Sequence, residues 1–200
     1  AAIFTYHRVL PANEISRNDS PNHGLIVSTE RFDEQMRYLS EKYRIISMDE
    51  LPDHLSDSSD FAIAVTFDDG YKDNLIYALP ILTKYSVPAT IYITTRFPEG
   101  DCRMWWYELE KLCGSHNSIV FTIKGKSYNF KMQNQIQRNR CFRKIHNLIQ
   151  SLSENEQNDL MSLIRQGRSP ENYKKYCLTW EDIQQLDREP LITIGAHTHS

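Results

Sequence analysis

Apolar residues in this sequence fall into short runs and into helical periods. Four runs have the length of a β-strand: residues 3–7, 61–67, 88–93 and 191–196. The run at 61–67 is nearly continuous, which is typical of a strand buried on both faces of a parallel sheet. Apolar residues at helical spacing predict helices over about 32–43 and 71–85. Strands and helices that alternate in this way predict an α/β fold.

Capping residues indicate where the helices begin. Ser28 or Thr29 can cap the helix over 32–43. Three further starts have a Ser or Thr with an acidic residue three positions later: Ser47 with Glu50, Ser153 with Glu156, and Thr179 with Asp182. Pro80 should kink or break the helix over 71–85, because proline has no backbone N–H to donate.

Residues 97–180 interrupt the alternation of strands and helices. They predict an aromatic-rich helix, a β-hairpin that turns at Gly125, and two more helices. The helices span about 104–112, 134–152 and 153–166. No flexible linker flanks the segment, so we expect a single domain over 1–200 with an α+β insertion at about 97–180. The polar residues 11–24 predict a loop.

Charge and cysteine usage exclude several classes of function. The net charge is -3 and the pI is near 6.2, so no basic field favours nucleic acid or anionic lipid as a partner. No apolar run reaches the ~18 residues of a membrane span. The chain lacks the charged and apolar start of a signal peptide, which leaves a removed leader and export open. The four cysteines have no C-x-x-C spacing, which argues against a zinc knuckle or a redox site and favours partly buried free thiols.

Two of the predicted strands end in residues that can carry chemistry. The strand at 61–67 is followed by Asp68, Asp69 and Gly70, and the strand at 191–196 by His197 and His199. In parallel α/β folds the carboxyl ends of the strands form the active-site edge. Adjacent residues point in different directions, so one carboxylate can bind a cation while the other accepts a proton. The alternative is a plain strand-to-helix turn with a helix cap.

The histidines extend this candidate site. Imidazole nitrogen and carboxylate oxygen together suit zinc or another late first-row divalent ion. His7 ends the first strand at the same kind of edge and could reach the pocket. A hydrogen-bonded structural histidine is the alternative for His7.

These residues match the motifs of a known family. The segment Thr66-Phe67-Asp68-Asp69-Gly70 resembles the first motif of NodB-like polysaccharide deacetylases (carbohydrate esterase family 4), and Ile194 to Ser200 resembles the start of their second motif, His-Ser/Thr-x-x-His. The family's first helix and next strand are similar to Tyr71-Lys72-Asp73-Asn74, Leu79-Pro80-Ile81-Leu82 and Val87-Pro88-Ala89-Thr90. Three further segments resemble the subgroup linked to exopolysaccharide and cell-surface glycan modification: Tyr6-His7-Arg8-Val9, Trp105-Trp106 and Thr179-Trp180.

The resemblance implies roles for single residues. Asp68 would be the general base, and Asp69 and His197 would be metal ligands. The second histidine ligand would lie four positions after His197, just past the end of the sequence. His199 occupies a variable position of the motif, and Tyr71 would line the pocket with it.

The resemblance also implies a fold, a cofactor and a substrate. The fold would be a distorted (β/α)-barrel that this chain has too few strands to close, so the domain would be truncated at its carboxyl end. The cofactor would be a divalent metal, Zn2+ first, with Co2+, Ni2+ or Mn2+ as alternatives. The substrate would be an acetylated polysaccharide or oligosaccharide, in a cell-envelope or extracellular setting, with a cytoplasmic one also open.

Several alternatives stay open. Trp105, Trp106 and Tyr107 would offer sugar rings an aromatic platform, or they simply pack in the core of the insertion. The protein would be a related metal-dependent amidohydrolase acting on a small amide, or a non-catalytic glycan-binding remnant. The base Asp68 has no use without chemistry, which counts against the remnant. A metal-free structural protein fits the motifs least.

Overall fold

The chain folds into two compact units. A computed structural model describes residues 1–15, 20–57 and 60–199. One unit contains Ala1–Ile15, Leu25–Cys102 and Tyr173–Ser200, and the second contains Ser16–Gly24 and Arg103–Asn172. Each unit is described by itself below.

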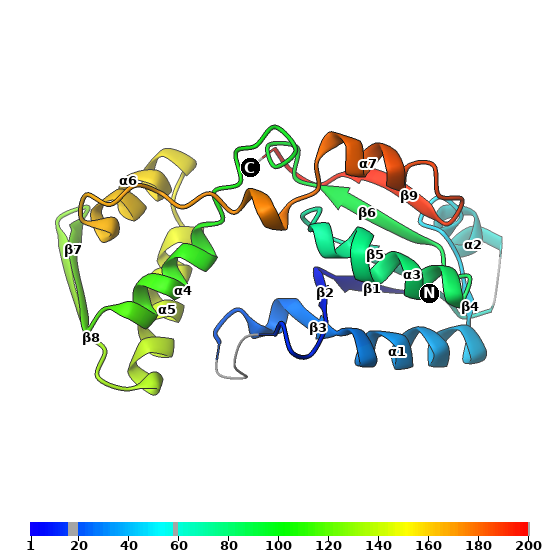
Figure 1. The fold of residues 1–200 in the computed structure, drawn as a ribbon, viewed down its shortest axis with the longest axis horizontal. Coiled ribbons are helices and arrows are strands. Elements are labelled where there is room, and N and C mark those ends of the chain that lie inside the picture. The colour runs from blue at the N-terminus through cyan, green and yellow to red at the C-terminus, as the bar shows by residue number, and fades with distance from the viewer. Residues whose placement is uncertain (16–19, 58–59, 200) are drawn as a thin grey trace. The chain divides into compact units, whose positions relative to one another are not determined.

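A parallel sheet forms the centre of the first unit. Its main strands are β1 (Ala2–Tyr6), β5 (Ala62–Phe67), β6 (Ala89–Ile93) and β9 (Ile192–Ala196), in this order across the sheet (Figure 1). The short β4 (Arg44–Ile45) pairs with the beginning of β5. Every pairing is parallel, and the spatial order follows the chain. Strands that follow one another in this way are found in (β/α)-barrels, whereas a doubly wound sheet reverses direction at a switch point.

Helices cover one face of this sheet. They are α1 (Thr29–Lys42), α3 (Leu79–Lys84) and α7 (Trp180–Leu186). Their apolar residues Phe32, Leu82 and Ile183 share a core with Val65 and Phe67 of β5. All six residues of β5 are buried, as the continuous apolar run predicts.

Local sequence signals place most helix starts correctly. Ser28 caps α1 by accepting a hydrogen bond from the Arg31 amide. The Ser47–Glu50 box precedes α2 (Leu51–Asp57), and the Thr179–Asp182 box begins α7.

The predicted helix over 71–85 is confirmed in its extent, because residues 72–84 are helical throughout. Its middle is a π-helical turn (Asn74–Ala78), which is followed by α3. The Leu79 amide donates to the Asn74 carbonyl, and Pro80 lies in the first turn of α3, where a missing N–H leaves no bond unmade.

Four short elements were not predicted. The strand β2 (Arg8–Leu10) pairs in parallel with β3 (Ile26–Ser28). The others are two 3-10 turns, η3 (Lys174–Tyr176) and η1 (His23–Leu25), of which η1 crosses from the second unit into the first.

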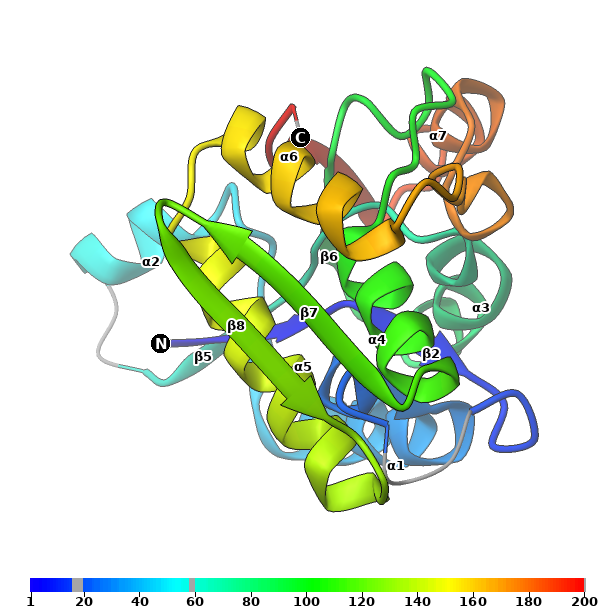
Figure 2. The same cartoon turned by 90° about the vertical axis from the view of Figure 1, so that its left-hand side faces the viewer.

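The second unit has its own hydrophobic core. It contains α4 (Trp105–Ser115), the hairpin β7 (Ser118–Ile123) and β8 (Lys126–Lys131), α5 (Gln135–Gln150) and α6 (Glu154–Arg165). Figure 2 shows the hairpin lying across the helices. Lys124 and Gly125 at the hairpin turn both have positive φ, as a tight two-residue turn requires. Residues 20–24 also group with this unit. They form turns and the start of a short 3-10 turn, within the loop that the sequence predicts over 11–24.

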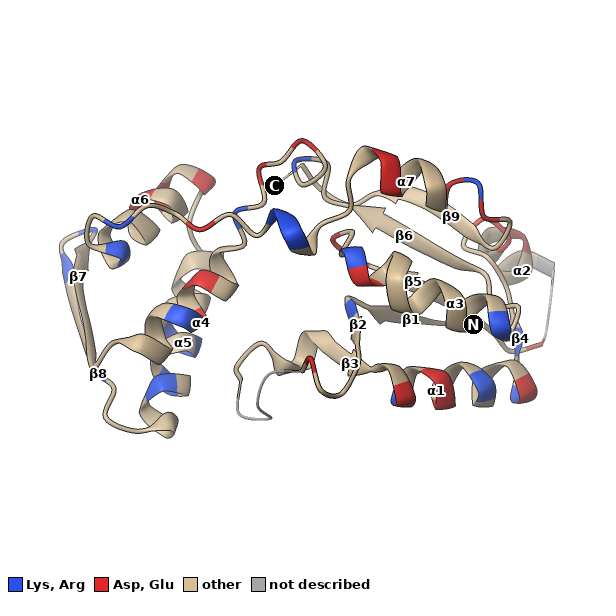
Figure 3. Ribbon diagram, in the orientation of Figure 1, with Lys and Arg blue, Asp and Glu red and all other residues tan. Residues whose placement is uncertain are grey.

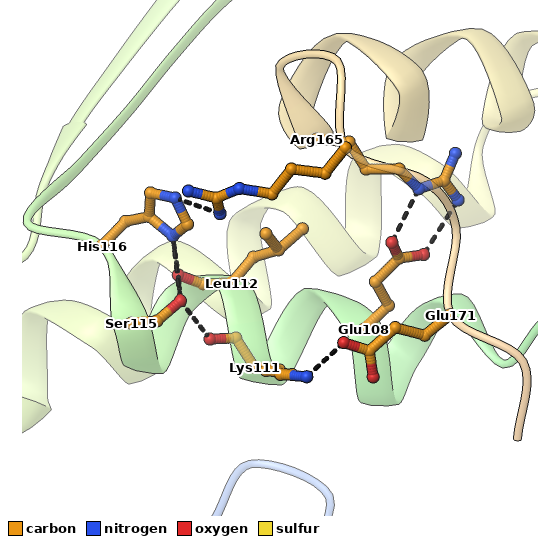
Figure 4. A network of polar contacts seen from close by, with 8 residues as sticks. Glu108, Lys111, Leu112, Ser115, His116, Arg165 and Glu171 are labelled. Carbon is orange, nitrogen blue, oxygen red and sulfur yellow. Dashed lines mark hydrogen bonds and ion pairs between the residues drawn. The ribbon is translucent and has the colours of Figure 1, made fainter.

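Ion pairs and hydrogen bonds tie the helices of the second unit together (Figure 4). Arg165 of α6 makes two hydrogen bonds of 2.7 and 2.8 Å to the buried Glu108 of α4. Lys111 of α4 pairs with Glu171, and Arg168 donates a hydrogen bond to Nε2 of the His116 ring.

The cysteines are free thiols, as the sequence predicts. All four cysteines are free and buried. In the part of the chain that the structure describes, no helix is long and apolar enough to cross a membrane.

Candidate active site

The candidate site begins where β5 ends. The Asp68 amide donates to the Tyr6 carbonyl at 2.9 Å, which continues the pairing of β5 with β1 by one residue. Asp69 and Gly70 then turn the chain with φ of 73° and 79°. Glycine is favoured at position 70, because its positive φ would strain a residue with a side chain. A Cβ there would in addition lie 2.9 Å from the Ile93 Cδ1 atom.

Asp68 faces two histidines from other strands. Its Oδ2 atom lies 3.8 Å from Nε2 of His197, which follows β9, and 4.0 Å from Nε2 of His7, which follows β1. The three side chains are partly exposed, between 22% and 35%. Residues far apart in the sequence meet here because the parallel strands all end at one edge of the sheet. The structure therefore brings His7 to the candidate site, a point that the sequence left open.

Asp69 has a different environment from Asp68. Burial raises the pKa of the Asp69 carboxyl above its ordinary value, and the positive charge that His7 and His197 can carry opposes the rise. The neighbouring Asp68 carboxylate acts in the same direction as burial and raises the pKa of Asp69 as well. A carboxylate in such a site gains from a nearby cation more than an exposed one does.

Tyr71 and His199 have distinct surroundings. Tyr71 is fully buried, and the Arg8 guanidinium lies 5.0 Å from the centre of its ring. The Nδ1 atom of His199 is 2.9 Å from the Thr95 hydroxyl, and the His199 carbonyl accepts a hydrogen bond from the Arg96 amide. These contacts fasten the segment after β9 to the segment after β6, which supports a structural role for His199.

A clamp that the sequence reasoning missed holds the segment carrying His7. The two Asp73 oxygens accept from the Val9 amide at 2.9 Å and from Arg8 Nε at 2.8 Å. The Asn74 side-chain amide donates to the His7 carbonyl at 2.9 Å. Asp73 and Asn74 come three and four residues after Gly70, so these contacts fix the Asp-Asp-Gly turn to residues 7–9. Their presence in the segment Tyr71-Lys72-Asp73-Asn74 was the available signal.

Trp105 and Trp106 lie in the second unit. Trp105 packs against that unit's core, with its ring 5.1 Å from the His146 ring. The Trp106 carbonyl accepts a hydrogen bond from Asn22, and its indole nitrogen is buried without a partner. The packing of Trp105 supports the core alternative, and the sugar platform stays a prediction.

The donor atoms at the site fit a divalent metal in kind. Asp69 offers carboxylate oxygen and His197 imidazole nitrogen, the ligand types that zinc takes. No group of three or more His, Cys, Asp or Glu residues within 1–15, 20–57 and 60–199 is arranged to hold a metal ion.

Solved structures share this fold. The chain aligns over its whole length with a de-N-acetylase from Aggregatibacter actinomycetemcomitans (TM-score 0.53, 14% identity, 55% of that chain covered). It also aligns over its whole length with IcaB from Ammonifex degensii (TM-score 0.51, 18% identity, 52% of that chain covered). The chain thus spans about half the length of these proteins, and the open parallel sheet corresponds to an incomplete NodB-type barrel. None of the curated proteins matches the chain.

A family model gives the assignment. The polysaccharide deacetylase model matches residues 56–200, which contain β5 with the Asp-Asp-Gly turn and β9 with His197. This range is well over half of the chain. The chain belongs to the polysaccharide deacetylase family.

Proposed function

We propose that the protein hydrolyses N-acetyl groups on a polysaccharide that contains N-acetylhexosamine. The observation that carries this proposal is Asp68, a partly exposed carboxylate held between His7 and His197 at the carboxyl edge of the sheet. The family assignment supports a hydrolase that acts on an acetylated polysaccharide. The motifs around Tyr6-His7-Arg8-Val9 and Trp105-Trp106 favour an exopolysaccharide or cell-surface glycan as the polymer. In this proposal the chain is one deacetylase domain with an insertion near residues 97–180.

Each residue of the site has a proposed task. Asp68 accepts a proton from the attacking water, and its exposure leaves room for that water and the acetamide. Asp69 and His197 would hold a divalent ion, most suitably Zn2+, since members of this family generally use one. A bound ion would lower the pKa of water and polarise the acetyl carbonyl. The His7 carbonyl accepts a hydrogen bond from Asn74, and the His7 ring places Nε2 4.0 Å from the Asp68 carboxylate, after a different strand from His197.

Two isosteric substitutions separate the base from the ligand. In full-length protein, Asp68→Asn should bind zinc as the wild type does but release acetate from an acetylated glucosamine polymer about 10²–10⁴ times more slowly, because proton transfer is lost. Asp69→Asn should weaken zinc binding, and added zinc should partly restore its activity.

The measurements are zinc titration calorimetry and acetate release. A chelator should stop the wild-type reaction, and zinc should restart it. Full activity of Asp68→Asn would show that another group is the base. Zinc binding without acetate release from any acetylated glycan would favour a glycan-binding remnant.

A further inference from the structure

The charge of this protein is divided unequally between its two units. Residues 16–24 and 103–172 contain twelve Lys and Arg against seven Asp and Glu, a net charge of +5. The remaining residues contain eleven against nineteen, a net charge of -8. The overall charge of -3 therefore hides a basic unit, and the expectation that no basic field exists holds only for the chain as a whole.

Many of the basic residues in the second unit are already engaged. Lys124 pairs with Glu156 at 2.8 Å, while Lys111 and Arg165 pair with acidic partners (Figure 4). Arg138 donates to three backbone carbonyls at the end of α4: those of Cys113, Gly114 and His116. These residues stabilise the unit and offer little charge to a ligand.

The unpaired positive charge collects on α5 and the adjoining β8. Arg140, Arg143 and Lys144 are exposed, and Arg140 lies three and four residues before the other two, which places all three on one side of α5. α5 contains no Asp or Glu (Figure 3). Lys126 of β8 is exposed as well. These four residues, the α5–β8 face, form no ion pair within the described part of the chain.

Two aromatic rings join the two parts of this face. Lys126 lies 5.3 Å from the Tyr128 ring centre and Lys144 lies 6.0 Å from the Phe130 ring centre. The two rings stack on each other with centroids 6.2 Å apart. Lys126, Tyr128 and Phe130 alternate along the strand and so share one face of β8, where Lys144 brings a cation of α5 to the Phe130 ring.

We propose that the α5–β8 face binds a carboxylate-bearing polysaccharide, as a second glycan contact of the deacetylase. Guanidinium groups pair with carboxylates through two parallel hydrogen bonds, and the rings present apolar surface to the C–H faces of sugars. This inference rests on the proposed function, because the glycan class of the ligand comes from there.

Other anionic partners fit the face less well. A membrane-binding helix inserts a broad apolar surface, whereas Ile136 is the one large apolar side chain exposed on α5, which is described throughout. Nucleic-acid duplexes are held by roughly 6–10 phosphate contacts. The face offers four cations, fewer than that number of phosphate contacts.

Binding of fluorescent polygalacturonate to the full-length protein tests the proposal. The triple variant Arg140→Gln/Arg143→Gln/Lys144→Gln should bind about tenfold more weakly than the wild type, and wild-type affinity should fall as salt rises from about 50 to 200 mM. The control Arg31→Gln/Arg37→Gln/Lys42→Gln removes the same charge from exposed positions of α1 and should bind as the wild type does. Methyl-esterified polygalacturonate, which needs no variant, should not bind.

Three results would overturn the proposal: equal loss in both triple variants, no loss in the α5 variant, or tighter binding of the wild type to duplex DNA or anionic phospholipid vesicles. If acetate release is absent from every variant while polygalacturonate binding still depends on α5, the proposed function fails and this binding site stands.

Discussion

Two consecutive residues at the end of β5 adopt a backbone conformation that only one of them tolerates freely. Gly70 reaches positive φ without strain, whereas a left-handed conformation costs an L-residue such as Asp69 about 1–2 kcal/mol. The Thr94 amide donates to the Asp69 carbonyl at 3.2 Å and helps to hold it there. Strained residues concentrate at functional sites, and Asp69 follows the proposed base Asp68 directly.

A second glycine of this unit is required by a side chain rather than by its backbone angles. A Cβ on Gly195 of β9 would lie 2.6 Å from Cδ1 of Tyr92, the residue paired with it on β6. Gly195→Ala should therefore lower the free energy of unfolding by about 1–3 kcal/mol, because the half-buried ring must move. Urea denaturation measures the change.

Gly114 gives the matched control. It is exposed in α4 with no atom near its virtual Cβ, so Gly114→Ala should be neutral or stabilise by up to about 1 kcal/mol. If both variants change the urea midpoint alike, the contact with Tyr92 is not what requires glycine at position 195.

At the scale of elements, β2 is held in place by the π-helical turn that follows the Asp-Asp-Gly motif. Arg8 and Asp73 are both buried, at 7% and 4% exposure, and Asp73 bridges the Arg8 side chain and the Val9 amide. The Arg8 guanidinium also lies 4.8 Å from the Tyr176 ring centre, so η3 closes over the pair. A buried ion pair of this kind adds specificity of arrangement more than net stability, but it is costly to break.

Asp73→Asn should destabilise the first unit by about 3–5 kcal/mol, because the Arg8 guanidinium stays buried without its counter-charge. Thermal unfolding followed by circular dichroism measures the loss. Asp33→Asn breaks the ion pair with Lys84, whose side chain is 57% exposed, and should change the midpoint only slightly. Equal effects of the two substitutions would show that burial gives the Arg8–Asp73 pair no special weight.

At the scale of the whole molecule, the chain has two separate hydrophobic cores. One lies between the parallel sheet and its helices, and the other lies among α4, α5, α6 and the hairpin. Separate cores allow sub-global opening of one unit while the other stays folded. We therefore expect core substitutions to act mainly on their own unit.

Ile145→Ala tests this expectation, because Ile145 is fully buried in the second core. The substitution should cost about 2–5 kcal/mol and speed hydrogen exchange in α4, α5 and α6, with β5 and β6 unaffected. Ile136→Ala, at a position of the same helix that is 79% exposed, should leave exchange unchanged. Equal acceleration in β5 and β6 would mean that the two units unfold as one.

Elements with a local cause could be predicted from the sequence. The strand β5 follows from its apolar run, α6 from the Ser153–Glu156 box and the hairpin from its alternation around Gly125. The parallel pairing of β2 with β3 could not, because nothing near residues 8–10 indicates that residues 26–28 lie beside them. The π turn inside the helix over 71–85 could not be predicted either, because periodicity does not distinguish a π turn from an α-helix.

The candidate site divides in the same way. Asp68, Asp69, Gly70 and His197 are recognisable from strand ends and motif spacing alone. The contact of His7 with Asp68 is visible only after folding. The same holds for the Arg8–Asp73 pair, which joins positions 65 residues apart.

The sequence alone determined the α/β class, the strand that ends in the two aspartates and the family motifs, because each of these depends on neighbours within a few residues. Tertiary structure decided that His7 faces Asp68, that Asp69 is left-handed, and that the basic residues left unpaired in the second unit gather on α5 and β8. Such features depend on contacts between distant segments. Chain folding brings those segments together, and local pattern does not encode which of them will meet.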